Sequence, residues 1–153
     1  ALAEIQARDS KIAIKTQSAG LLSFNFVPDT FDLIVSEFTL HHLPDFWKAV
    51  ALSRILRALK PGGQLFLRDI VFVSVPDGAE RDIGQWADFN IKNHDFPRED
   101  VATHMRDEHS TFGWVMERLL TDVGFTLVSA DYHAPLHGTY LSRKPDPADA
   151  RIQ

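Results

Sequence analysis

FDLIVS at residues 31–36 and QLFLRDIV at residues 64–71 are the two stretches that decide the fold. Each is a nearly continuous apolar run of strand length, which is typical of parallel strands covered on both faces. A strand, a helix and a strand within roughly 30 residues form a βαβ unit, so we expect a parallel sheet here. The predicted crossover helix has one apolar stripe, with steps of three and four residues: Phe46, Trp47, Val50, Ala51, Ile55, Leu56 and Leu59.

Both ends of this helix carry sequence signals. Pro44-Asp45 predicts its start, where the Asp45 carboxylate would accept hydrogen bonds from free backbone N–H groups. KPGG at residues 60–63 predicts its end, because proline cannot continue the hydrogen-bond ladder and glycine can turn left-handed.

The flanking segments continue the mixture of helix and strand. Upstream, we predict the last turns of a helix over 1–8 and an edge strand over 11–16, where apolar and polar residues roughly alternate. Downstream, after a loop, we predict a helix over 79–91 and then a polar stretch through 94–97. A further helix is predicted over 111–123, preceded by a polar segment in which Ser110 or Thr111 would cap it.

The C-terminal part predicts a hairpin. Residues 125–132 and 139–143 have strand patterns and are close enough in sequence to pair antiparallel, and 145–153 is predicted to be a tail. With 153 residues and 44% hydrophobic content, the chain has the size and composition of one globular domain.

Composition also excludes several functions. Sixteen Lys and Arg against twenty-one Asp and Glu give a net charge of -5, the wrong sign for a general nucleic-acid binder. The absence of cysteine removes disulfides, thiolate zinc sites and cysteine nucleophiles, and it fits a cytoplasmic location. No apolar run approaches the roughly 20 residues that span a bilayer.

Read in order, FDLIVS at 31–36, LHHLPD at 40–45, LKPGG at 59–63 and the apolar strand after them resemble the second half of the class I S-adenosylmethionine-dependent methyltransferases. The match covers the family's fourth strand, the next helix and the fifth strand, and the C-terminal hairpin corresponds to the one that closes the family's sheet. The resemblance implies an α/β, Rossmann-like, doubly wound and mostly parallel sheet with a C-terminal antiparallel hairpin. It places a partial methyltransferase domain over 1–144.

Two family features have no counterpart in these residues. They are the glycine-rich loop after the first strand and the acidic residue that ends the second; Gly62-Gly63 ends a helix instead of opening one. We therefore expect the N-terminal strands to be missing from these residues. Their absence would leave an unpaired backbone edge beside Phe31.

The resemblance implies S-adenosylmethionine as cofactor. Ligands of open α/β sheets lie across the carboxyl ends of the strands, so residues there are the candidates. His41 would lie at the mouth of the methyl-transfer pocket. Phe38 would also suit the sulfonium with its aromatic face, although an ordinary core role fits it as well. The expected cofactor contacts are Ser36, Glu37 and Phe38 for the methionine part and Gly20 and Leu21 for the adenine, where relatives often carry an acidic residue.

Methyl transfer is an in-line displacement, so the protein mainly holds the acceptor and, for some acceptors, removes a proton. The candidate bases are His41, His42, Asp69 and His104. The histidine pair could instead be one packed and one solvated residue at the start of the helix. Because charges inside a strand are costly unless paired near its end, Arg68-Asp69 is expected to face the cleft from the strand end.

Three side chains are candidates for binding the substrate: Arg68, Arg106 and Trp114. Arg106 could hold a carboxylate or phosphate, or pair with Asp107 or Glu108 at the surface. Trp114, together with Trp86 and Phe89, could form the floor of a substrate pocket, or these residues could pack along helix stripes.

The expected partner is a small molecule, with no nucleic acid and no membrane, and a homodimer is left open. No metal is expected, because His133 and His137 flank Pro135, and His104 and His109 are too far apart for adjacent helical turns. One alternative function is a non-catalytic methyltransferase-like binding or assembly module. Another, half of a dinucleotide-dependent oxidoreductase, gives no reason for LHHLPD and LKPGG.

Overall fold

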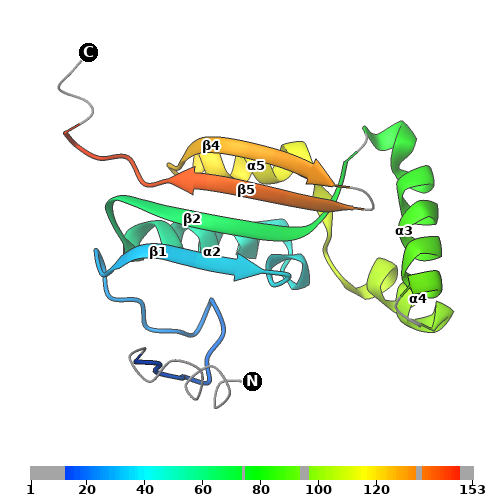
Figure 1. The fold of residues 1–153 in the computed structure, drawn as a ribbon, viewed down its shortest axis with the longest axis horizontal. Coiled ribbons are helices and arrows are strands. Elements are labelled where there is room, and N and C mark those ends of the chain that lie inside the picture. Colours follow the sequence, from blue (N-terminus) through cyan, green and yellow to red (C-terminus); the bar gives the residue numbers. More distant parts are fainter. Residues whose placement is uncertain (1–12, 74, 94–96, 134–135, 149–153) are drawn as a thin grey trace.

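The computed structural model describes residues 13–73, 75–93, 97–133 and 136–148. Its architecture is mixed α/β, as expected, with helices packed on an open sheet (Figure 1). The elements in chain order are β1 (Phe31–Glu37), η1 (Leu40–His42), α2 (Asp45–Ala58), β2 (Leu59–Phe72), η2 (Pro76–Gly78), α3 (Ala79–Asn93), α4 (Arg98–Asp107), β3 (Thr111–Phe112), α5 (Gly113–Asp122), β4 (Thr126–His133) and β5 (His137–Arg143).

The sheet has the order β1-β2-β5-β4, and β3 adds a short pairing to the end of β2. β1 and β2 are parallel and joined by α2, which confirms the predicted βαβ unit, while β5 and β4 form the predicted antiparallel hairpin. Within the described residues the second edge of β1 is unpaired, as expected beside Phe31.

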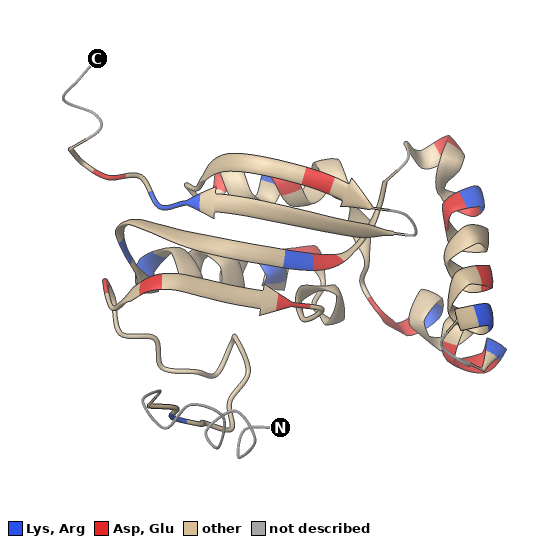
Figure 2. Ribbon diagram, viewed as in Figure 1, with Lys and Arg blue, Asp and Glu red and all other residues tan. Residues whose placement is uncertain are grey.

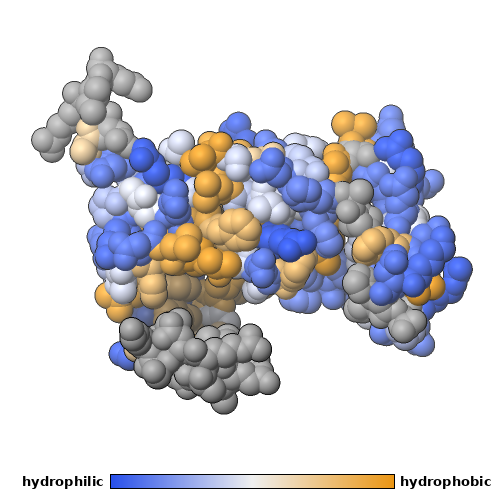
Figure 3. All heavy atoms as spheres, in the orientation of Figure 1, coloured by the Kyte–Doolittle hydropathy of each residue, from blue (hydrophilic) through white to orange (hydrophobic). Residues whose placement is uncertain are grey.

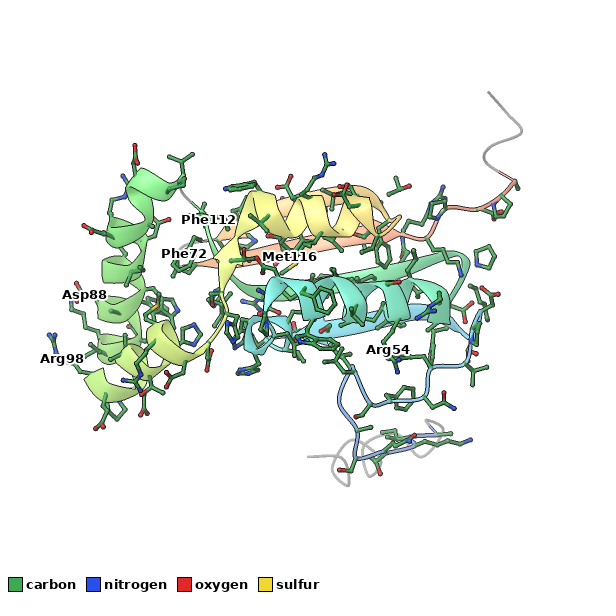
Figure 4. The ribbon with its side chains drawn as sticks, turned by 180° about the vertical axis from the view of Figure 1, so that it is seen from behind. Arg54, Phe72, Asp88, Arg98, Phe112 and Met116 are labelled. Atoms are coloured by element: carbon green, nitrogen blue, oxygen red, sulfur yellow. The ribbon has the colours of Figure 1, made fainter. Side chains whose placement is uncertain are left out.

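α2 and α5 lie side by side on one face of the sheet (Figure 4). The main core fills the layer between them and the strands, because alternate residues of β2 are buried toward this face. The opposite face of the described sheet carries an apolar band (Figure 3). Leu33 and Val35 of β1 are exposed. The main core consists of Leu40, Ala51, Leu52, Ile55, Leu59, Leu65, Leu67, Val71, Met116, Leu120, Phe125 and Tyr140.

α3 and α4 pack together beyond the carboxyl end of β1 (Figure 1). A second, small core contains Trp86 of α3, Val101 of α4 and Leu136, with Ile70 and Phe72 of β2 packed against it. Charged residues are dense on these two helices and sparse on the strands (Figure 2). None of the described helices is long and apolar enough to cross a membrane.

Several predicted elements need correction. The described part of the predicted edge strand, 13–16, forms no strand, and the predicted helix over 1–8 lies outside the described residues. α4 is a helix that the sequence pattern did not predict. The predicted helix over 111–123 begins with β3, so α5 starts only at Gly113.

The predicted helix caps are also wrong. α2 and α5 have no side-chain hydrogen bond at their N-caps, Pro44 and Phe112. Asp45 instead accepts a hydrogen bond from Lys48, 2.7 Å away, and Thr111 is drawn into β3 by its pairing with the end of β2.

Candidate active site

A tight turn at the carboxyl end of β1 positions the site. Phe38 follows the strand with φ 48°, a left-handed conformation that is uncommon for a bulky residue, and its backbone N–H donates to Arg68 at 2.9 Å. The chain then turns into η1, which carries His41 and His42. The turn therefore brings His41 beside Asp69, near the carboxyl end of β2.

Asp69 of β2 holds His41 in place. Its carboxylate is fully buried and accepts a hydrogen bond from the Leu40 backbone N–H at 2.7 Å and another from the Ile70 N–H at 2.9 Å. Its Oδ1 also lies 2.5 Å from Nδ1 of the buried His41. Because Nδ1 is directed at this carboxylate, the Nε2 atom of His41 is the nitrogen left to exchange a proton with another group.

The C-terminal turn of α4 completes a cluster around Nε2. Glu108 Oε2 lies 3.2 Å from His41 Nε2 and also contacts His104 Nδ1. The other ring nitrogen of His104, Nε2, lies 3.2 Å from Ser110 Oγ, and the Trp86 ring packs on His104 at 4.6 Å. Burial lowers the pKa of His104 from its ordinary value, against the opposing effect of the Glu108 carboxylate.

Backbone contacts fix this cluster relative to η1. The His109 N–H donates to the His41 carbonyl at 2.6 Å. The fully buried Lys48 of α2 donates from Nζ to the His109 carbonyl and to Asp45. The residue that follows Glu108 is thereby attached to both η1 and α2.

Arg68 and Asp69 point to opposite faces of the sheet, because successive side chains of a strand alternate. Arg68 is level with Glu37, the last residue of β1, and its guanidinium lies 5.2 Å from the Phe38 ring. His137 of β5 contacts the same ring at 5.3 Å. The expectation that Arg68 and Asp69 face one cleft together is therefore wrong: only Asp69 reaches the histidine cluster.

The residues expected to hold the cofactor lie near the end of β1. Gly20 and Leu21 share an apolar hollow with Thr39, His42 and Leu43. At the end of β1, the Oγ of the buried Ser36 has no hydrogen-bond partner within the described residues.

Of the other predicted site residues, Arg106 and Trp114 lie apart from this cluster, and His42 lies at its edge. Arg106 pairs with the neighbouring Asp107 at 2.8 Å, and both are exposed. Trp114 is exposed and stacks on Phe112 at 5.9 Å. Phe112 in turn contacts Phe72 at 5.5 Å at the end of β2 (Figure 4). His42 is about half exposed, with its Nδ1 3.7 Å from Glu108 Oε1.

Glu108 and Lys48 were missed as site residues. The available signal was spacing: Glu108 follows His104 by four residues and Lys48 follows Asp45 by three, so each pair shares one helical face.

Comparisons with known proteins agree with this architecture. A family model described as a methyltransferase domain matches residues 3–130. A curated relative, 27-O-demethylrifamycin SV methyltransferase of Amycolatopsis mediterranei, is 41% identical over 56 residues, which cover 36% of this chain and 20% of the relative. Methyltransferase str3 of Strobilurus tenacellus is 31% identical over 119 residues, which cover 76% of this chain and 39% of the relative. The chain thus spans less than half the length of these two relatives.

A solved structure shares the fold. The S-adenosylmethionine-dependent methyltransferase from Mesorhizobium loti superposes with a TM-score of 0.63 at 18% identity, covering 93% of this chain and 74% of that chain. At this identity the likeness concerns the fold alone.

Proposed function

The chain belongs to the methyltransferase domain family, and from that premise we propose that it transfers the methyl group of S-adenosylmethionine to a small molecule, with His41 as the base. The contact between Asp69 and His41 is the observation that carries this proposal. Methyl transfer to a hydroxyl requires a group that takes up the hydroxyl proton, and a histidine oriented by a buried carboxylate suits that task.

Asp69 acts on the reaction through His41. Its buried carboxylate accepts from two backbone N–H groups, which fix its position, and from His41 Nδ1. This contact keeps the Nδ1 proton in place, so that Nε2 presents its lone pair, and it stabilises the imidazolium that forms once Nε2 has taken a proton. In this role Nε2 must exchange its contact with Glu108 for one with the acceptor.

The residues at the end of β1 fit the cofactor. Bound S-adenosylmethionine would supply the activated methyl group, held on a positively charged sulfur. The Ser36 Oγ, which has no hydrogen-bond partner within the described residues, is a polar atom available to the methionine part, and the partly exposed Phe38 offers an aromatic side chain to the sulfonium. The hollow at Gly20 and Leu21 has the apolar character that an adenine ring requires.

Charge and relatives support a small acceptor. The net charge of -5 disfavours nucleic acid, and the name of the relative from Amycolatopsis mediterranei describes methylation of a small molecule at oxygen. Arg68, Arg106 and Trp114 remain the proposed substrate contacts. Only Arg68 lies against a proposed cofactor residue, Phe38.

The test combines cofactor binding with turnover. We expect calorimetric titration with S-adenosylmethionine to show binding, and radiolabelled methyl transfer into a small-molecule extract to show activity. His41→Ala should lower turnover by about a hundredfold or more, because it removes the base, while cofactor affinity changes little. Asp69→Asn should lower turnover in the same way.

His133→Ala is the matched control, since that histidine is exposed and lies outside the cluster. Equal turnover in His41→Ala, Asp69→Asn and the unchanged protein would remove both residues from the mechanism. Cofactor binding with no transfer to any fraction would favour the non-catalytic binding module instead.

A further inference from the structure

Three potential ligand atoms from two elements converge beside the Asp69–His41 contact. They are His41 Nε2 of η1, His104 Nδ1 of α4 and Glu108 Oε2 just after α4, and all lie within 4.8 Å of one another. We propose that these three side chains form a binding site for a divalent transition-metal ion of the zinc class. Two imidazoles and one carboxylate are a donor set that suits such ions, whereas magnesium and calcium prefer oxygen donors.

The distance between His41 Nε2 and Glu108 Oε2 fits coordination of one ion. Ligand atoms placed about 2.1 Å from a tetrahedral ion lie roughly 3.4 Å from each other. Glu108 Oε2 is 3.2 Å from His41 Nε2 and also contacts His104 Nδ1. Although it is buried, this oxygen makes no aligned hydrogen bond within the described residues. The oxygen therefore lies close to both ring nitrogens but forms an aligned hydrogen bond with neither.

In each histidine, the ring nitrogen that does not face Glu108 also has a polar contact. Asp69 Oδ1 lies 2.5 Å from Nδ1 of His41, and Ser110 Oγ lies 3.2 Å from Nε2 of His104. Metal-binding histidines characteristically engage their other nitrogen in this way, which fixes the ring and directs the free lone pair at the ion. The contact of the Trp86 ring with His104 further restricts that imidazole.

The local charge also favours a cation. Two carboxylates, Asp69 and Glu108, flank His41. The nearby ammonium of Lys48 is bonded to Asp45 and to the His109 carbonyl. Among the described residues, no lysine or arginine forms an ion pair with Glu108, so the cluster has carboxylate charge that a metal ion would balance.

Pairs of histidines alone do not predict this site, because His104 and His109 are too far apart for adjacent helical turns. The helix places His104 beside a carboxylate four residues later, and η1 supplies the second imidazole. The inference goes beyond the proposed function. Since one lone pair of His41 Nε2 cannot bind an ion and accept a proton together, the metal-bound site would not use His41 as a base.

The test uses the metal ion alone. After removal of metals with a chelator, calorimetric titration of the purified protein with Zn²⁺ should show one equivalent bound, and Co²⁺ should give visible d–d absorption bands. Glu108→Gln, which preserves side-chain volume, and His104→Ala should each weaken binding at least about tenfold. His109→Ala is the matched control and should bind normally, because only backbone atoms of His109 contact the cluster.

Absence of binding heat, or equal affinity in Glu108→Gln, His104→Ala and the unchanged protein, would overturn the proposal. If His104→Ala fails to fold, Glu108→Gln alone decides. Both readouts are independent of methyl transfer, so the metal site and the proposed function can each fail without the other.

Discussion

Phe38 shows how a single residue shapes the end of β1. Its left-handed backbone, with φ 48°, places the side chain between Arg68 and His137. For an L-residue other than glycine this conformation costs about 1 kcal/mol or more. Such a conformation persists where surrounding contacts impose it, and here the Phe38 N–H is bonded to Arg68 of β2.

The cost of this conformation can be measured by comparing two variants. Phe38→Gly and Phe38→Ala both remove the ring, but only glycine adopts positive φ without strain. We expect the glycine variant to have a free energy of unfolding about 1 kcal/mol higher than that of the alanine variant in chemical denaturation. A more stable alanine variant would show that the backbone of residue 38 is not constrained as described.

Lys48 is a second residue whose contacts the sequence did not predict. Its buried ammonium binds Asp45 and the His109 carbonyl, and so connects α2 to the segment that carries Glu108. Lys48→Met keeps most of the side-chain volume but leaves the His109 carbonyl without this donor. We expect a loss of unfolding free energy on the order of 2 kcal/mol, measured by urea denaturation.

Lys60→Met supplies the control for this measurement. Lys60 pairs with Asp32 at 2.8 Å, but Lys60 is about half exposed and Asp32 is largely exposed, so replacement of Lys60 should change stability by less than about 1 kcal/mol. Equal losses of unfolding free energy in the two variants would mean that burial does not strengthen the contacts of Lys48.

At the scale of elements, the packing of α5 on the sheet depends on Gly113. A Cβ atom at this position would collide with the Tyr132 ring on β4. Gly113→Ala should therefore push the start of α5 away from β4 and lower the free energy of unfolding by about 1 to 3 kcal/mol. Thermal and chemical denaturation would measure this loss.

Gly84 in α3 is the matched position for this substitution, because nothing lies within 4 Å of a Cβ added there. Alanine has the higher helix propensity, so Gly84→Ala should raise stability by up to about 1 kcal/mol. The two glycine substitutions are thus expected to have opposite signs, and a destabilising Gly84→Ala would contradict the open surroundings of that residue.

Hydrophobic periodicity predicted the elements whose own sequence contains a clear apolar pattern. The apolar runs of β1 and β2, the helix α2 and the two strands of the hairpin are found, but Phe46 and Trp47 of the predicted α2 stripe are exposed. α4 was missed because Val101 is its one buried residue in the described part, which gives too weak an apolar stripe. An alternating pattern over 11–16 predicted a strand, but a strand requires a neighbour to pair with, and 13–16 has none in the described structure.

The sequence predicted several residues of the site, but it did not predict the contacts among them. His41, Asp69 and His104 were named from residue type and place in the chain. Their meeting depends on the pairing of β1 with β2, which brings residues 28 apart in sequence into hydrogen-bond contact. Glu108 was considered only as a partner for Arg106, because the helix that places it beside two imidazoles was not foreseen.

For the whole molecule, the division into two cores predicts uneven local stability. Within the described residues, the core at α3 and α4 contains three buried residues, Trp86, Val101 and Leu136, whereas the main core connects α2, α5 and the sheet. Small cores open at lower free-energy cost. In native-state hydrogen exchange, we expect protection factors in α3 to be at least about tenfold lower than those in β2 and β5.

Trp86→Ala provides the control for this difference. The substitution should reduce protection in α3 and α4 while leaving β2 and β5 nearly unchanged, because Trp86 belongs to the smaller core. Uniform loss of protection throughout the chain would show that the two cores unfold as one unit.

The pH dependence of stability is a property of the whole molecule to which two histidines contribute in the same direction. Burial lowers the pKa of His137, and the charges of Arg68 and His133 lower it further, against the attraction of Asp69. Burial also lowers the pKa of His104. Both values fall below the ordinary 6.5, so the unfolded chain binds more protons than the folded one as the pH falls through this range.

The stability contributed by these neutral histidines is therefore present above pH 6.5 and is lost as the pH falls below it. We expect the free energy of unfolding, measured by urea denaturation with a chelator present, to decrease from about pH 7.5 to about pH 5.5. His137→Gln removes one of the two groups and should make this decrease smaller. A decrease of unchanged size in that variant would show that His137 is not the group responsible, because a residue that does not titrate cannot contribute to the slope.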